Sequence, residues 1–264
     1  MTPRDTAMPV LSAQGLRRSF GAVVAAADIH IDVARGERLC LIGSNGAGKT
    51  TFVNMVTGYL KPTEGRIVLA GEDITARTPR EITRRGVARS FQIPQLCLQM
   101  TALENMLLAL HCSRGQRAFL RPARDAASVM RCRELLAAFS LEAHAQRPVR
   151  ELPGGVRKLL DIAMALTAQP LLLLLDEPTS GVSGDEKFAT MDTVMRAIER
   201  TGSEAAVTLI FVEHDMDIVR RYAHRVAAFY SGRVIALGAP DEVLVNADVR
   251  RHVTGGAHAT KVTA

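Results

Sequence analysis

Residues 43–51 have the types and spacing of a loop that binds the phosphates of a nucleotide. Their sequence, Gly-Ser-Asn-Gly-Ala-Gly-Lys-Thr-Thr, fits the pattern G-x-x-x-x-G-K-[ST] at every fixed position. An apolar run before the loop (residues 39–42) predicts a strand, and the segment after it (residues 52–56) predicts a helix. In this context glycines let successive backbone N–H groups point toward a phosphate, and the helix N-terminus adds its positive end. The sequence therefore predicts that the chain binds a nucleoside triphosphate.

Two side chains of this loop have distinct predicted roles. We expect Lys49 to reach the β- and γ-phosphates and Thr50 to offer its hydroxyl to Mg²⁺. A glycine-rich turn that binds nothing is the alternative, but it does not account for the fixed residues and the flanking elements together. The predicted nucleotide contacts of the loop are Ser44, Asn45, Gly46, Ala47, Gly48, Lys49, Thr50 and Thr51.

Asp176 and Glu177 directly follow a run of five leucines, residues 171–175. A fully apolar run of this length is typical of a central parallel strand that is covered on both faces. Because the carboxyl ends of parallel strands meet at one edge of a sheet, we expect both carboxylates near the phosphates. Asp176 can hold the water shell of Mg²⁺, and Glu177 can accept a proton from the attacking water. Together with the phosphate loop, this pair predicts hydrolysis.

Three further side chains have predicted roles at the same site. His214 and Gln92 each follow a predicted strand. The His214 imidazole can donate a hydrogen bond to charge that develops on the reacting phosphate, although a lone histidine is a structural residue by default. The Gln92 amide can contact both Mg²⁺ and the lytic water. Phe20, on the bend of residues 19–21, can stack on a nucleotide base, and an ordinary core phenylalanine is the alternative.

Composition indicates a globular protein of 264 residues, of which 47% are hydrophobic and 23% charged. The longest apolar run, residues 171–175, is far shorter than the ~20 residues needed to cross a bilayer. The N-terminal residues lack the apolar core of a secretion signal, so we expect a cytosolic protein. The net charge of +6 is weak evidence for contact with phospholipid or nucleic acid. The four cysteines lack paired spacing and are expected to be reduced thiols.

The order of the predicted elements indicates a helical lobe inserted into an α/β core. Residues 10–42 predict β structure, and from about residue 93 to 150 the helical period dominates. After Gly154 and Gly155 the core pattern resumes with a helix, the leucine strand and further strands and helices. Residues beyond about 247 carry little pattern, and we expect them to fray.

These motifs, in this order, resemble those of the nucleotide-binding subunits of ABC transporters. Residues 43–51 match the Walker A loop, and residues 171–177 match the Walker B strand with its catalytic glutamate. Residues 152–156 lie where the signature motif belongs, and residues 180–183 occupy the D-loop position. The resemblance covers almost the whole chain and is specific, because several ordered motifs must agree.

Single residues extend the resemblance. Phe20 matches the base-stacking aromatic, Gln92 the Q-loop glutamine and His214 the switch histidine. The resemblance implies catalytic roles for Glu177, His214 and Gln92. It also implies that Gly154 and Gly155 of the signature motif contact nucleotide.

The resemblance implies an α/β fold: a P-loop NTPase (RecA-like) core with an N-terminal antiparallel β subdomain and an inserted α-helical subdomain, as in an ABC ATPase. A single ATP-binding domain would span residues 8–255. Residues 1–92 and 159–255 would form the nucleotide-binding α/β core, and residues 93–158 the helical subdomain with the signature loop. Residues 256–264 would be a flexible tail.

Among ABC ATPases, the chain looks most like those of branched-chain amino acid importers, through residues 58–66, 86–92 and 213–216. This implies ATP and Mg²⁺ as cofactors and a peripheral, cytoplasmic position on the inner face of the cell membrane. It also implies two membrane permease subunits, a periplasmic solute-binding protein and a second, often non-identical ATPase subunit as partners. We expect no nucleic-acid partner.

The sequence leaves other functions open. An ATPase of another ABC system, such as an amide or urea importer or a lipopolysaccharide exporter, is the first alternative. Soluble ABC ATPases of DNA repair or translation usually carry coiled-coil insertions or two ATPase halves, and neither is visible here. A small-molecule kinase that shares only the phosphate loop would need an acceptor pocket in place of His214 and the helix after Gly154.

Three residues depart from the motifs of the family. Pro153 replaces the signature serine, Val156 replaces the signature glutamine, and Ser183 stands where Asp or Asn is usual in the D-loop. ABC subunits sandwich ATP between one subunit's Walker A loop and the other's signature. Both sites of a homodimer would contain the altered signature, so both would be weakened. We therefore expect a heterodimer; the alternative is that Pro153 is neutral, because proline recurs at this position among similar importer ATPases. Gly154 and Gly155 still open a helix, whose backbone amides can keep an anion site.

Residues 95–100, next to Gln92, are apolar for a loop. We expect them to help form the groove that receives a short cytoplasmic helix of the permease. The alternative is that the loop is buried under the helical lobe.

Overall fold

The computed structural model describes residues 8–90, 94–113, 125–201 and 206–255. The chain divides into two compact units: unit 1 comprises Met1–Arg77 and Val212–Ala264, and unit 2 comprises Thr78–Phe211. The phosphate loop therefore belongs to unit 1, and the Walker B acids belong to unit 2. Gln92 lies outside the described residues.

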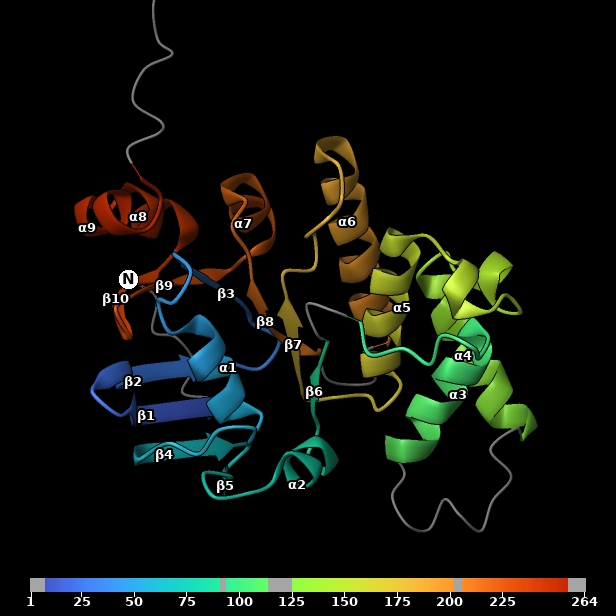
Figure 1. Cartoon of the computed structure of the whole chain (residues 1–264), viewed down its shortest axis with the longest axis horizontal. Helices are drawn as coiled ribbons and strands as arrows, with labels where there is room; N and C mark the ends of the chain where they lie inside the picture. The colour runs from blue at the N-terminus through green and yellow to red at the C-terminus, as the bar shows by residue number, and fades with distance from the viewer. Residues whose placement is uncertain (1–7, 91–93, 114–124, 202–205, 256–264) are drawn as a thin grey trace, which may run out of the picture. The chain divides into compact units, whose positions relative to one another are not determined.

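An antiparallel sheet in unit 1 has the strand order β2-β1-β4-β5. Figure 1 shows β1 (Leu11–Phe20), β2 (Val23–Val33) and β4 (Glu64–Leu69) side by side; β5 is Glu72–Asp73. Polar and apolar residues alternate along the end of β2, where Ile29, Ile31 and Val33 are buried and the residues between them are exposed. This alternation is that of a half-buried strand, since a strand turns successive side chains to opposite faces, and it agrees with the β structure predicted for residues 10–42.

The strand that leads into the phosphate loop also lies in unit 1. β3 (Arg38–Gly43) pairs in parallel with β9 (Arg225–Tyr230), which pairs antiparallel with β10 (Arg233–Gly238). Residues 39–42 of β3 are fully buried, which fixes the base of the loop in the core. Helix α1 (Lys49–Val56) begins inside the loop and buries Phe52 and Val53.

The C-terminal part of unit 1 corrects the prediction that residues beyond about 247 fray. After α7 (Met216–Tyr222) and α8 (Pro240–Val245), residues Ala247–His252 form helix α9. The Asn246 side chain caps α9 by accepting hydrogen bonds from the N–H groups of Asp248 and Val249. Val249 is fully buried, and the His252 ring stacks on Tyr230 at 4.2 Å. An N-terminal cap and tertiary packing therefore stabilise a helix too short for its own periodicity to predict.

The strands β8, β7 and β6 follow one another in this order in the second sheet. β6 (Val87–Arg89) pairs in parallel with β7 (Leu172–Asp176), and β8 is Thr208–Val212, whose last residue belongs to unit 1. The leucines of β7 are at most 1% exposed, which confirms the predicted central strand. Asp176 is its last residue.

The described part of unit 2 contains five α-helices. They are α2 (Pro79–Arg84), α3 (Ala102–Ser113), α4 (Ala126–Ala138), α5 (Gly154–Leu166) and α6 (Gly184–Thr201), with 3₁₀ turns η2 (Glu142–His144) and η3 (Val149–Glu151). Thr78 forms a capping box with Glu81, and Asp125 accepts a hydrogen bond from the Ser128 N–H. Within the four described stretches, no helix combines the length and hydrophobicity needed to cross a bilayer.

Candidate functional site

Two glycines of the phosphate loop are required by close backbone contacts within unit 1. A Cβ on Gly43 would lie 2.5 Å from the carbonyl oxygen of Phe229, and one on Gly48 would lie 2.8 Å from that of Ala25. Gly48 also has a φ of 110°, which residues with a side chain rarely adopt. The loop is therefore held in its curled shape by β9 and β2, and any larger residue would force it open.

Lys49 is buried inside this curled loop. Its Nζ donates hydrogen bonds to the carbonyl oxygens of Gly43 at 2.6 Å and Ser44 at 3.1 Å. The side chain is thus folded back over the loop, where its ammonium can meet an incoming phosphate. By contrast, Ser44, Asn45, Gly46 and Thr50 are exposed, and Thr51 is half-buried.

The turn between β9 and β10 supports the loop, a role that the sequence did not reveal. The Gly232 N–H donates to the carbonyl oxygen of Ala47 at 2.9 Å, and the Gly232 carbonyl accepts from the Ala27 N–H at 2.8 Å. Gly232 has a φ of 77°. The Ser-Gly pair at 231–232 indicates a turn between strands, but nothing local in the sequence indicates that the turn contacts the phosphate loop.

Phe20 is an exposed aromatic ring and not a core residue. It is 50% exposed at the end of β1, and the guanidinium of Arg18 lies 5.0 Å from the centre of its ring. Val23 and Val24 in the same hairpin are 67% and 53% exposed. An apolar surface of this kind offers a face for a flat base, which supports the stacking hypothesis.

His214 lies at the exposed start of the segment that follows β8. The Glu213 N–H donates to the carbonyl oxygen of Leu41 at 3.4 Å, which places this segment beside β3, the strand that enters the phosphate loop. The Glu213 side chain is buried and accepts from the His214 N–H at 3.2 Å. Asp215 then caps α7. His214 is therefore held between a buried strand end and a capped helix while its side chain reaches solvent.

The buried Glu213 carboxylate also affects Cys40 in β3. Burial, and then the negative charge of Glu213, raise the pKa of the Cys40 thiol well above its ordinary value. This thiol is consequently protonated and inert at neutral pH. Cys40 is fully buried in β3, so it is a core residue and not a candidate nucleophile.

Asp176 in unit 2 is held by two basic side chains that the sequence did not single out as site residues. Arg89 Nη2 of β6 lies 3.0 Å from Asp176 Oδ2, and these side chains are only 10% and 14% exposed. Lys158 Nζ of α5 donates to the backbone carbonyl of Asp176 at 3.1 Å. The end of β7 is thus tied to the strand before Gln92 and to the helix after the signature glycines.

Glu177 has an unusual backbone conformation. Its φ is 48°, in the left-handed region that costs energy for a residue with a side chain. The Glu177 carbonyl accepts from the Ser180 N–H at 3.1 Å, so a tight turn imposes this conformation. Strain at a half-buried carboxylate that follows a central strand is typical of a functional position.

Gly154 and Gly155 begin helix α5, and neither the backbone conformation nor the surrounding space requires glycine at these positions. A Cβ built on either would meet nothing within 4 Å, and neither has a positive φ. Pro153 occupies the N-cap and makes no side-chain capping hydrogen bond. The exposed backbone amides at this helix start therefore suit close approach by a group from outside the chain.

The residues present fit a magnesium ion that is held mainly by phosphate. Thr50 and Asp176 provide the hydroxyl and carboxylate oxygens that Mg²⁺ prefers, and Mg²⁺ usually keeps several waters beside few protein ligands. Among the described residues, there is no group of three or more His, Cys, Asp or Glu side chains that could hold a metal by themselves. That Thr50 and Asp176 act together stays a prediction, because they belong to different units.

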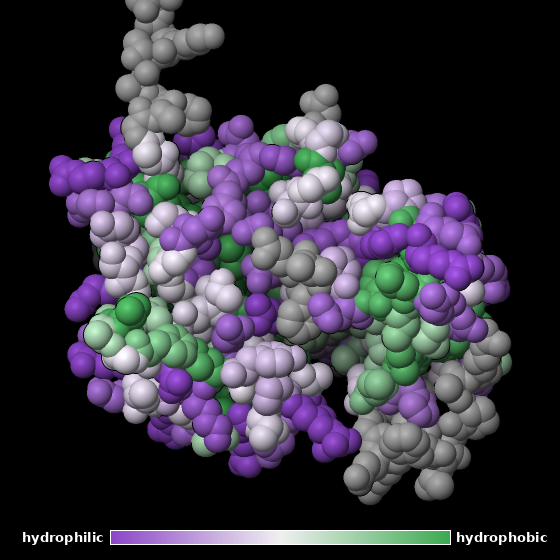
Figure 2. All heavy atoms as spheres, in the orientation of Figure 1, coloured by the Kyte–Doolittle hydropathy of each residue, from purple (hydrophilic) through white to green (hydrophobic). Residues whose placement is uncertain are grey.

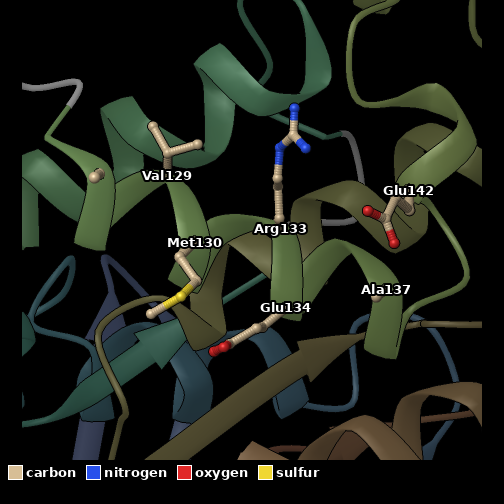
Figure 3. A pocket seen from close by; sticks show the side chains of 7 residues that line it. Val129, Met130, Arg133, Glu134, Ala137 and Glu142 are labelled. Atoms are coloured by element: carbon tan, nitrogen blue, oxygen red, sulfur yellow. The ribbon is translucent and has the colours of Figure 1, made fainter.

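A separate open groove of about 500 Å³ runs along α4, and none of the predicted site residues lines it (Figure 3). Its lining residues are Ala126, Val129, Met130, Arg133, Glu134, Ala137 and Glu142.

Comparison with known proteins decides the family. A family model described as ABC transporter matches residues 26–180. The chain belongs to the ABC transporter family. This membership confirms the predicted fold class, a P-loop α/β ABC ATPase with an antiparallel β sheet and added helices. ATP-binding proteins of ABC transporters hydrolyse ATP to power transport, so the predicted enzyme class is confirmed as well.

Relatives of this ABC ATPase match over almost its whole length. The probable branched-chain amino acid transport ATP-binding protein LivG of Archaeoglobus fulgidus is 34% identical, and the match covers 92% of this chain and 94% of that protein. The high-affinity branched-chain amino acid transport ATP-binding protein BraF of Pseudomonas aeruginosa is 33% identical, with coverage of 94% and 99%. A solved ATP-binding cassette of an ABC transporter in its ADP conformation has a TM-score of 0.80 at 30% identity, covering 93% of this chain and 98% of that chain.

Proposed function

We propose that this chain is the ATP-hydrolysing subunit of an importer for branched-chain or other hydrophobic amino acids, at the inner face of the cell membrane. The observation that carries the proposal is the phosphate loop, which is curled against Phe229 and Ala25 with Lys49 folded over it. The names of the two relatives, both branched-chain amino acid transport ATP-binding proteins, support the substrate class. Ligand binding by the cognate solute-binding protein of this system would separate these amino acids from amides or urea.

The residues of the site divide the chemistry among them. The loop amides and Lys49 would bind the phosphates, Thr50 and Asp176 would hold the magnesium ion with its waters, and Phe20 would stack on the base. Mg²⁺, when bound, neutralises charge on the phosphates. Glu177 accepts the proton of the attacking water, and a positioned base of this kind typically contributes ~10²- to 10⁴-fold in rate. His214 donates a hydrogen bond to the charge that develops on the γ-phosphate.

A second ATPase subunit completes each site in this proposal. The open space around Gly154 and Gly155 supports contact with nucleotide that is bound to another subunit. Pro153 has neither the hydroxyl nor the N–H with which a signature serine would bind a phosphate. A non-identical partner with an ordinary signature therefore restores one full site, which favours a heterodimer.

The heterodimer proposal predicts that the purified chain alone hydrolyses ATP at least about tenfold more slowly than the complete complex, because loss of one phosphate donor typically costs ~10²-fold or more. Phosphate release at saturating ATP measures both rates. The double variant Pro153→Ser, Val156→Gln should raise the rate of the chain alone. If the unmodified chain alone were as fast as the complex, the heterodimer proposal would be wrong.

The loop of residues 95–100 is the proposed contact with the permease. Cys97 and Gln99 are exposed, and Leu98 is 47% exposed, so the alternative of a buried loop does not fit these residues. Figure 2 shows hydrophobic side chains gathered on the helical part of unit 2. Buried Asn105 holds the loop: its Oδ1 accepts from the Cys97 N–H at 2.9 Å, and its Nδ2 donates to the Cys97 carbonyl at 3.1 Å. A rigid loop with an exposed leucine suits an apolar helix of a partner.

Leu98→Lys is expected to abolish amino-acid uptake by the complete transporter and to leave ATP hydrolysis by the free subunit unchanged. The reason is that a charge on the docking surface must be desolvated when the permease binds. Uptake of labelled amino acid into proteoliposomes and phosphate release are the two measurements. Leu108→Lys is the matched control, because Leu108 is 38% exposed on α3 outside this loop. Normal uptake with Leu98→Lys would contradict the assignment.

A further inference from the structure

The ion pair at Asp176 carries an inference that rests on the proposed function. Arg89 Nη2 lies 3.0 Å from the carboxylate that is assigned to the magnesium site, and both side chains are largely buried. We propose that Arg89 competes with Mg²⁺ for Asp176. The guanidinium neutralises the carboxylate until the magnesium nucleotide binds, and it must then give up part of this contact.

The pairing of β6 and β7 holds Arg89 at the carboxylate. Arg89 lies opposite Leu174 in the parallel register, two residues before Asp176, and its side chain extends toward the end of β7. The Ser90 N–H continues the ladder by donating to the Leu174 carbonyl at 2.9 Å, and Ser90 is fully buried. The backbone at Arg89 is therefore fixed, and the guanidinium stays within reach of Asp176.

Two basic side chains already lie at the end of β7 before any metal ion binds. Asp176 and Glu177 provide two negative charges, and Arg89 and Lys158 provide two positive charges, with Lys158 only 5% exposed. Salt and water screen buried charges weakly. A second cation that approaches Asp176 is thus repelled by Arg89 at close range, so the arginine raises the Mg²⁺ concentration that the site requires.

An orienting role for Arg89 is the rival explanation, and it predicts the opposite result. Groups that hold a metal-binding carboxylate in place often increase metal affinity, and their loss typically costs 10–100-fold. Under competition, removal of the arginine charge lowers the Mg²⁺ requirement, whereas under orientation it raises the requirement. The direction of the change therefore decides between them.

The test measures the Mg²⁺ concentration that gives half-maximal binding of a non-hydrolysable ATP analogue. We expect this concentration to fall about tenfold in Arg89→Gln, which removes the charge, and about two- to threefold in Arg89→Lys, whose shorter side chain weakens the contact. The melting temperature in EDTA should fall in Arg89→Gln, because the buried Asp176 carboxylate loses its counter-ion. The magnesium analogue should then raise that melting temperature by more than it does in the unmodified protein.

A matched control separates competition from general destabilisation. Arg225 pairs with Glu37 at 2.9 Å with side chains 21% and 9% exposed, so Arg225→Gln breaks a similar pair outside the nucleotide motifs. It should lower the melting temperature and leave the Mg²⁺ midpoint unchanged. If Arg89→Gln does not fold, the comparison of Arg89 with Arg89→Lys decides. The proposal is overturned if the Mg²⁺ midpoint is the same in all three proteins or rises when the arginine is replaced. If the unmodified protein shows no magnesium-dependent binding of the ATP analogue, the proposed function itself is wrong.

Discussion

Replacement of Glu177 by glutamine is expected to lower ATP turnover about 10²- to 10⁴-fold and to leave the affinity for ATP nearly unchanged. The glutamine amide has the size of the carboxylate and cannot accept the proton of the attacking water. The strained backbone at Glu177, with its φ of 48°, is set by the surrounding turn, and glutamine suffers the same strain. The loss should therefore appear in kcat, measured by phosphate release, and not in stability.

A matched carboxylate distinguishes this loss from a general effect of removing negative charge. Glu186 is exposed in α6, outside the proposed site, and Glu186→Gln should retain full turnover. Equal turnover in Glu177→Gln and the unmodified protein would contradict the assignment of Glu177 as the base. A melting temperature close to that of the unmodified protein would show that the variant is folded.

Replacement of Lys49 by alanine is expected to weaken ATP binding itself, by about 10- to 100-fold. Hydrogen bonds to charged groups contribute about 1.5–3 kcal/mol, and each 1.4 kcal/mol corresponds to about tenfold in affinity. Lys49 Nζ donates to the Gly43 and Ser44 carbonyls, so its ammonium is already held at the loop. Equilibrium dialysis with radiolabelled ATP at millimolar Mg²⁺ measures the change.

Lys61→Ala is the control for Lys49→Ala, because Lys61 is an exposed lysine of the same unit. Its ATP affinity should match that of the unmodified protein. Because Lys49 is buried, circular dichroism must first show that Lys49→Ala keeps its secondary structure. Unchanged ATP affinity in folded Lys49→Ala would refute the proposed phosphate contact. If the unmodified protein failed to retain labelled ATP, the proposal that it binds nucleotide would be wrong as well.

The chemistry of this protein could be predicted from short contiguous motifs. The phosphate loop carries its glycines and Lys49 within nine residues, and Asp176 and Glu177 follow a run of leucines. Such motifs can be recognised in a sequence because neighbouring residues in the chain act on the same ligand. The strand β7 and the helix after Gly154 were equally predictable from the sequence. A strand that is buried on both faces is a continuous apolar run, whereas a helix that is buried on one face has apolar residues at helical spacing.

Helix α9 could not be predicted from the spacing of its apolar residues. Its six residues are too few to show an amphipathic pattern, and α9 depends on the Asn246 cap and on the contact of His252 with Tyr230. The signal in the sequence was the asparagine at the cap position. An asparagine alone does not predict a helix, because the helix also needs a packing partner that is distant in the chain.

The tertiary structure alone decided which residues support the motifs. Arg89 reaches Asp176 across 87 positions in the sequence, and Gly232 supports the phosphate loop at Ala47. These contacts arise because strand pairing brings distant segments together, and the identity of the partner is not encoded in the period of either segment. The sequence by itself therefore indicated the family and the ATPase chemistry, and it predicted the acids and bases of the site. The tertiary structure determined the charge balance at Asp176, because an ion pair depends on distance in space.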